Sequence, residues 1–90
     1  MLKCFIVQNI DDNTPIGVFN KGEFYIAKIS NNDTNTFAIL DENENWVPFN
    51  RYSIENSNLF YSSYFNEKHE HYFRNKKELN DYIDITQLYK

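Results

Sequence analysis

The sequence predicts a small, mainly β domain with one short C-terminal helix. The expected sheet has five or six short strands, either closed into a small barrel or curled as an antiparallel sheet. Apolar and polar residues alternate along several short stretches, which is typical of half-buried strands. Asn-rich turns separate these stretches. Eight Phe, seven Tyr and one Trp give a 90-residue chain the large side chains that a thin core requires.

The first half of the chain contains three expected strands. They cover residues 2–10, 23–30 and 36–41. In each strand neighbouring apolar residues alternate between two faces, so that Phe24 and Ile26 lie opposite Tyr25. The connections are a loop over 11–17 punctuated by Pro15 and Gly17, a turn at 20–22, and a polar hairpin loop over 31–35.

The second half of the chain begins with a turn at 43–45 and a short strand over Trp46–Phe49. Pro48 confines that strand to an edge or to a strand end, because proline cannot donate to the ladder. A 3₁₀ turn is expected within 50–54. A strand over 59–65, a turn over 67–70 and a returning strand over 71–73 follow.

After residue 74 the spacing of apolar residues changes from every second position, as in a strand, to every third or fourth position, as in a helix. Asn75 and Glu78 are spaced as a capping box, and Leu79, Tyr82 and Ile83 share one helical face. This helix is short and requires packing against the sheet to be stable.

Composition favours one domain over residues 1–90 that acts in a reducing cytoplasm. The net charge is −4 and the pI about 5.0, which disfavours binding to nucleic acid or to an anionic membrane. No segment has the roughly 20 apolar residues of a membrane span, and the N-terminus lacks the pattern of a signal peptide. Cys4 is the only cysteine and is expected to be a buried, inert thiol. We expect no cofactor.

Two segments carry a resemblance to a known family. They are KGEFYIAKI at 21–29 and FAILDENENWVPF at 37–49. This pattern resembles the small SH3-like barrel proteins of bacteriophages and prophages of low-GC Gram-positive bacteria, over positions 19 to 54. The resemblance implies an SH3-like core over about 1–54 and an extension over 55–90 with a strand pair and the helix. It implies little about function, because such barrels host many roles.

The residues that could bind a metal or catalyse a reaction are each better explained as ordinary solvated side chains. His69 and His71 would share one face of a strand and could chelate a metal, but they have no recognisable third ligand and are expected to be solvated. The carboxylates at 41, 42 and 44 fall in an expected exposed turn, whereas catalytic carboxylates need a pocket that shifts their pKa. The nucleophile, P-loop and metalloprotease motifs are absent. The sequence therefore predicts no metal site and no enzyme.

The candidate partner-binding residues are acidic and aromatic. Acidic residues dominate between 31 and 58, and if the two turns in this region lie at one end of the fold, that end attracts basic protein surfaces. Some of the aromatic residues exceed what the core needs and are expected to form a binding surface. The predicted set is Asp33, Asp41, Glu42, Glu44, Trp46, Phe49 and Tyr52.

The leading functional hypothesis is a non-catalytic phage-type protein that binds and inhibits a host protein. Its target would be a nucleic-acid-processing or anti-phage defence factor with a basic surface, and the protein itself a monomer or small homo-oligomer. Two alternatives remain. A small barrel can bind single-stranded nucleic acid on exposed aromatics, with Arg74, Lys76 and Lys77 holding phosphate. A structural module would self-associate through an uncapped edge strand.

Overall fold

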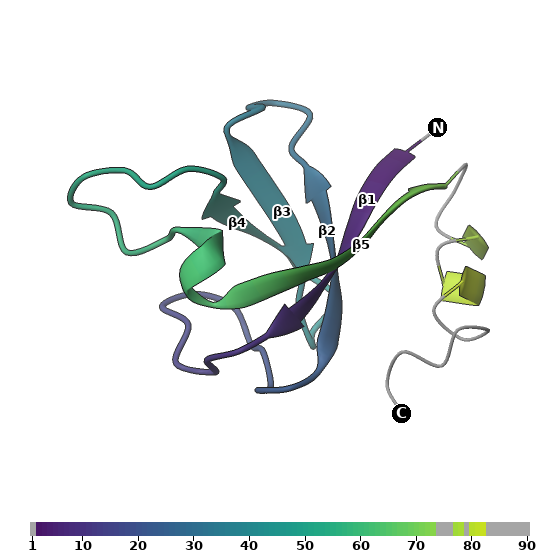
Figure 1. The fold of residues 1–90 in the computed structure, drawn as a ribbon, viewed down its shortest axis with the longest axis horizontal. Helices are drawn as coiled ribbons and strands as arrows, with labels where there is room; N and C mark the ends of the chain where they lie inside the picture. The colour runs from purple at the N-terminus through teal and green to yellow at the C-terminus, as the bar shows by residue number, and fades with distance from the viewer. Residues whose placement is uncertain (1, 74–76, 79, 83–90) are drawn as a thin grey trace.

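Five antiparallel strands form one sheet that is not closed into a barrel (Figure 1). The fold is known from a computed structural model that describes the backbone of residues 2–73, 77–78 and 80–82 and the side chains of 4–67, 77–78 and 80–82. The elements are β1 (Leu2–Asn9), β2 (Phe24–Ile29), β3 (Thr36–Leu40), β4 (Trp46–Asn50), the 3₁₀ helix η1 (Tyr61–Ser63) and β5 (Phe65–Phe73). The strand order is β4-β3-β2-β1-β5. The prediction of a small, mainly β protein is confirmed.

The period-two pattern places alternate residues of each strand on opposite faces of the sheet. One face carries the main core, which includes Phe5 and Val7 of β1, Tyr25 and Ala27 of β2, and Phe37 of β3. The other face carries a smaller cluster of Cys4, Ile6 and Ile26, against which Tyr82 packs. The faces expected for these strands are therefore confirmed. Burial also raises the pKa of the Cys4 thiol to about 11, so the thiol is protonated and inert at neutral pH.

Aromatic packing brings the two edges of the sheet towards each other. The rings of Phe49 on β4 and Phe65 on β5 lie edge to face with their centroids 5.3 Å apart. One parallel bridge joins Asn50 to Phe60, and the Asn50 amide donates to the carbonyl of Leu59 at 2.7 Å. The sheet is thus curled around its main core, while β4 and β5 form no continuous ladder.

Three predictions for residues 50–73 are wrong. The 3₁₀ helix lies at Tyr61–Ser63, not within 50–54. No strand runs over 59–65, and the expected turn at 67–70 with its returning strand is one continuous strand, β5. The reason is tertiary pairing, because β5 pairs with β1 along its whole length with a bulge opposite Ile6 and Val7. The expected strand pair of the extension is therefore a single strand, which adds to the sheet beside the N-terminal strand.

The expected C-terminal helix is not confirmed as an element of the fold. Residues 77–78 and 80–82 have helical backbone. Asn75, the expected N-cap, lies outside the described residues. So does Ile83, the last residue of the expected apolar face. Pro48 lies on β4, an edge strand, as its missing N–H predicts.

The loop between β1 and β2 folds back onto the core at Gly17. Gly17 has a φ of +74°, and a Cβ added there would lie 2.6 Å from Cε2 of Phe19 and 2.9 Å from Cγ2 of Val47. Gly22 in the same loop has a φ of +89° with no atom within 4 Å of such a Cβ. Both glycines need a left-handed backbone, but only Gly17 also leaves no room for a side chain. Comparing substitutions at the two positions therefore distinguishes the cost of backbone strain from the cost of a steric collision.

We expect Gly17→Ala to lower the free energy of unfolding by about 3 kcal/mol, because it adds a collision to the cost of a left-handed backbone. Gly22→Ala is the matched control and should cost only about 1 kcal/mol. Urea unfolding followed by fluorescence measures both. Equal losses for the two variants would contradict the close approach at Gly17.

Candidate functional site: an acidic cleft at one end of the sheet

The predicted acidic residues do not gather at one end of the sheet. Asp33 lies in the loop before β3, whereas Asp41, Glu42 and Glu44 lie in the turn after it. A strand separates the two connections, and Figure 1 shows them at opposite ends of β3. The condition that both turns lie at one end of the fold is therefore not met, because the two connections of a strand lie at its opposite ends.

A different set of acidic residues shares the end at which Glu42 lies. The long loop between β1 and β2 reaches this end and is tied to the turn after β3 by a hydrogen bond from the Glu42 amide to the carbonyl of Val18. The loop contributes further carboxylates, and Lys21 is its only base. The acidic residues of this end are Asp11, Asp12, Glu23, Asp41, Glu42 and Glu44.

Asp41 is a structural residue of the turn. Its side chain is 6% exposed, and its carboxylate accepts from the amides of Val18, Asn43 and Asn45 at 2.9 to 3.1 Å. Burial opposes the charge of this carboxylate, but the three N–H donors outweigh it and hold the pKa of Asp41 below its usual value. Asp41 thus joins the β1–β2 loop to the turn, and both of its carboxylate oxygens accept backbone hydrogen bonds.

Glu42 is the centre of a polar network at the same end. The Tyr25 hydroxyl donates to Oε1 of Glu42 at 2.6 Å, and Nδ2 of Asn20 donates to the same oxygen at 3.0 Å. The Tyr25 oxygen in turn accepts from the Asn20 amide at 2.7 Å. Tyr25 rises from the core face of β2, so a buried ring holds an exposed carboxylate in a fixed position.

The carboxyls of Glu23 and Glu42 shift each other's pKa in opposite directions. The hydrogen bond to Glu42 raises the pKa of Glu23, while the hydrogen bonds from Tyr25 and Glu23 lower the pKa of Glu42. Burial and the neighbouring Glu42 raise the pKa of Tyr25, which therefore keeps its proton and acts as a donor. Two carboxylates this close favour binding of a cation, because a cation relieves their mutual repulsion.

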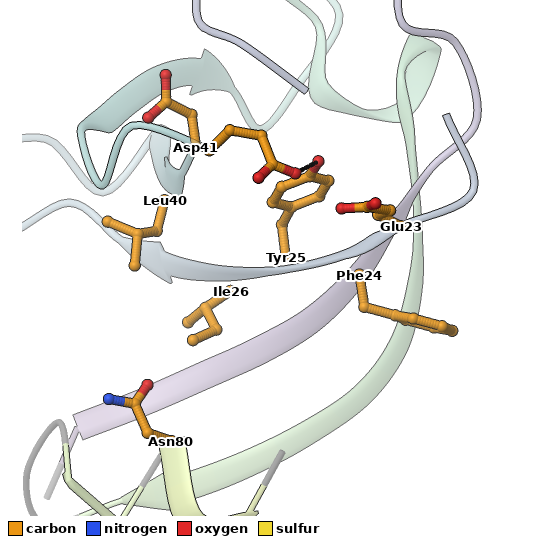
Figure 2. Close-up of a pocket in the computed structure, with 8 residues that line it drawn as sticks. Glu23, Phe24, Tyr25, Ile26, Leu40, Asp41 and Asn80 are labelled. Carbon is orange, nitrogen blue, oxygen red and sulfur yellow. Dashed lines mark hydrogen bonds between the residues drawn. The ribbon is translucent and has the colours of Figure 1, made fainter. Parts of the chain in front are cut away.

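A cleft of about 250 Å³ opens beside these carboxylates. In Figure 2 the side chains of Phe24, Ile26 and Leu40 point to the side on which Asn80 lies, whereas the Tyr25 ring and Glu23 lie on the opposite side of β2. The cleft therefore combines an apolar floor from β2 and β3 with a carboxylate rim. It is the most complete candidate site among the described residues.

The three predicted aromatic residues have different positions. Phe49 is 1% exposed and belongs to the core, so it does not reach a partner. Trp46 is 40% exposed, and the ammonium of Lys28 lies 4.2 Å from its ring centroid. Tyr52 is 57% exposed, and the guanidinium of Arg51 lies 5.3 Å from its ring. Neither exposed ring lies in the acidic cleft.

The remaining predicted sites have little structural support. Asp33 accepts hydrogen bonds from the Asn35 amide and the Thr36 hydroxyl, which fold its own loop. Glu44 is exposed in the turn with a φ of 61°. No group of three or more potential metal ligands occurs in the described part of the chain, and the side chains of His69 and His71 lie outside it.

The hypothesis of single-stranded nucleic-acid binding relies on Arg74, Lys76 and Lys77, of which the structure describes only Lys77. Arg74 and Lys76 lie outside the described residues. The ammonium of Lys77 lies 3.2 Å from Oδ2 of Asp81, one helical turn further on. Such an exposed pair contributes little to stability.

Comparison of the chain with protein-family models, curated proteins and solved structures finds no match. Within the described residues, no helix has the length and apolar character that crossing a membrane requires.

Sequence reasoning missed Glu23, Tyr25 and Asn20 as members of the site. Glu23 lies directly before β2 and Glu42 closely follows β3, two strands that are antiparallel neighbours. The start of one strand and the end of the next are adjacent in such a pair. That adjacency was available from the strand boundaries, whereas the hydrogen bonds that fix Glu42 depend on how the β1–β2 loop folds back.

We expect Asp41→Ala to lower the free energy of unfolding by about 2–3 kcal/mol, because three amides lose their acceptor. Asp33→Ala is the control, since it removes a similar acceptor from an exposed loop, and it should cost about 0.5–1 kcal/mol. Urea unfolding at pH 7 measures the difference. The stabilisation by Asp41 is present above its unfolded pKa and should vanish as the pH falls through its lowered folded pKa. A variant whose stability matches that of Asp33→Ala would refute the structural role of Asp41.

We expect the Glu23 carboxyl to titrate at a higher pH than that of Glu42 in ¹³C NMR spectra. Glu23 therefore stabilises the fold at low pH and loses this effect as the pH rises through its folded pKa, while Glu42 acts in the opposite direction. In Glu42→Gln the pKa of Glu23 should fall towards its ordinary value. Glu44→Gln is the control and should leave it unchanged. If the pKa of Glu23 were the same in the wild-type protein and in Glu42→Gln, the two carboxyls would not influence each other.

Proposed function

We propose that this protein is a non-catalytic binding protein that engages a basic surface of a host protein through the acidic cleft. The observation that carries this proposal is the Glu23–Glu42 pair, held by Tyr25 and Asn20 at the rim of the cleft. A prearranged carboxylate pair reduces the entropy lost when a partner binds.

The cleft fits the chemistry of a lysine or arginine side chain. Its floor of Phe24, Ile26 and Leu40 can cover the methylene groups of such a residue. Its two carboxylates can then receive the charged head group, which makes a charge-assisted hydrogen bond. The negative potential of the same end, to which the carboxylates of the β1–β2 loop contribute, would steer a basic partner towards the cleft.

The fold supports an SH3-like relationship as part of this proposal. The strand order places the last strand beside the first, and a 3₁₀ helix directly precedes that last strand. The curl of the sheet around one aromatic core is also what a small barrel requires. Together with the phage-type motifs, these features favour a phage-encoded protein that acts in the host cytoplasm and inhibits a nucleic-acid-processing or defence factor.

The test is affinity capture from a low-GC Gram-positive lysate with three baits, followed by mass spectrometry and by direct titration of the recovered partner. We expect the wild-type protein to retain a stoichiometric partner with a basic surface. The double variant Glu23→Gln/Glu42→Gln should bind it at least about tenfold more weakly, because each charge-assisted contact contributes on the order of 1.5–3 kcal/mol. Glu55→Gln, which removes one exposed carboxylate from the loop after β4, is the control and should bind normally.

Two outcomes would contradict the proposal. One is the absence of any stoichiometric partner. The other is a partner whose affinity is lowered equally by the double variant and by Glu55→Gln, since that result would indicate general charge effects rather than recognition by the cleft.

A further inference from the structure

A second cleft lies on the outer face of the sheet, and its charge is opposite to that of the acidic cleft. Its volume is about 300 Å³. Lys28 of β2, Ala38 of β3 and Pro48 of β4 are cross-strand neighbours in register, and they form its floor together with Trp46. The short side chain of Ala38, between two larger neighbours, leaves the space. The rim is polar and consists of Ser30, Asn31, Asn32 and Thr36.

The cation of this cleft is held in place without a carboxylate partner. The ammonium of Lys28 lies 4.2 Å from the centroid of the Trp46 ring, and none of the ion pairs between described residues includes it. The carboxylate of Asp33, in the loop between β2 and β3, accepts hydrogen bonds from the Asn35 amide and the Thr36 hydroxyl. A positioned and unneutralised ammonium in a chain of net charge −4 is a feature that an anionic ligand would use.

The rim of the cleft adds hydrogen-bond donors to this charge. The Ser30 oxygen accepts from the Asn32 amide at 3.3 Å, which leaves its hydroxyl hydrogen available to donate. The side-chain amides of Asn31 and Asn32 are exposed beside it. These groups and the ammonium can together surround the several oxygens of a phosphate, which has more acceptors than a carboxylate.

The apolar wall of the cleft fits a flat ring. Trp46 is 40% exposed, and Pro48 lies next to it on the same face of the edge strand. Aromatic rings stack on tryptophan with an energy that is useful for binding. The volume of about 300 Å³ is at the lower end of the range for ligand pockets, which suits a small ligand such as one ring with a sugar and a phosphate.

We propose that this cleft binds a mononucleotide, with the base against Trp46 and Pro48 and the phosphate on Lys28 and Ser30. The site is independent of the acidic cleft, which lies at the other end of β2 and β3. A long single strand is disfavoured, because Lys28 is the only base among the described residues that line the cleft, and the acidic end of the sheet would repel a polyanion.

Trp46 is the only tryptophan in the chain, so its indole N–H gives a single resonance that reports on the cleft. The experiment is a ¹⁵N NMR titration of the full chain with adenosine and cytidine monophosphates, the parent nucleosides and inorganic phosphate. We expect the monophosphates to shift the indole signal and the amides of 28 to 32 saturably. Nucleoside alone and phosphate alone should each bind at least about tenfold more weakly, because each lacks one half of the contacts.

Variants distinguish binding in this cleft from general electrostatic attraction of the phosphate to the protein. Lys28→Met should weaken binding of the monophosphate about tenfold or more. Lys21→Met is the control, because it removes the same charge from the β1–β2 loop, and it should leave binding unchanged. Ala38→Leu should also abolish binding by filling the floor, and its fold can be checked from the remaining spectrum.

Four results would overturn the proposal, and three of them come from the small-molecule titrations. These three are the absence of any saturable shift with a monophosphate, an equal loss of affinity in Lys21→Met and Lys28→Met, and an affinity for inorganic phosphate equal to that for the monophosphate. A short single-stranded oligonucleotide that bound more than tenfold tighter than the monophosphate would also overturn it, because the ligand would then be a strand rather than a small molecule.

Discussion

The packing of Phe19 against three other rings is the interaction on which the rest of this structure depends. Its ring centroid lies 5.0 Å from those of Tyr25 and Phe65 and 5.9 Å from that of Phe49. These rings belong to β2, β5 and β4, so one side chain from a loop joins a central strand to both edges of the sheet. Without it, the curl of the sheet would leave its aromatic core open at this end.

The same loop conformation that inserts Phe19 also creates the acidic cleft. Gly17 allows the loop to approach Val47 closely, Val18 then exchanges hydrogen bonds with the turn after β3, and Asn20 reaches Glu42. Tyr25 belongs to both systems, because its ring packs on Phe19 and its hydroxyl holds Glu42. The position of the carboxylates is thus a consequence of core packing, which fixes them more firmly than a solvated turn could.

The sequence predicted those parts of the fold that depend on local pattern. Alternation placed Phe5 and Val7 on one face of the sheet and Cys4 and Ile6 on the other, because period two is a property of any strand. It did not predict β5, whose polar run resembles a turn until pairing with β1 satisfies its backbone groups. The same limit explains why the sequence places Asp41 on the surface, since its burial depends on contacts such as the amide of Val18, which lies 23 positions away in the sequence.

Register explains why two clefts of opposite charge lie along β2. Along β2 the outward positions are Phe24, Ile26 and Lys28, so the face changes from apolar to cationic over its length. The carboxylates lie where the β1–β2 loop meets this strand, and Lys28 lies where the strand ends, beside the smallest residue of β3. A cation and a carboxylate pair held apart by a rigid strand cannot neutralise each other. Each therefore stays available to a ligand of its own, and the strand that separates the two sites also belongs to the core that holds them both.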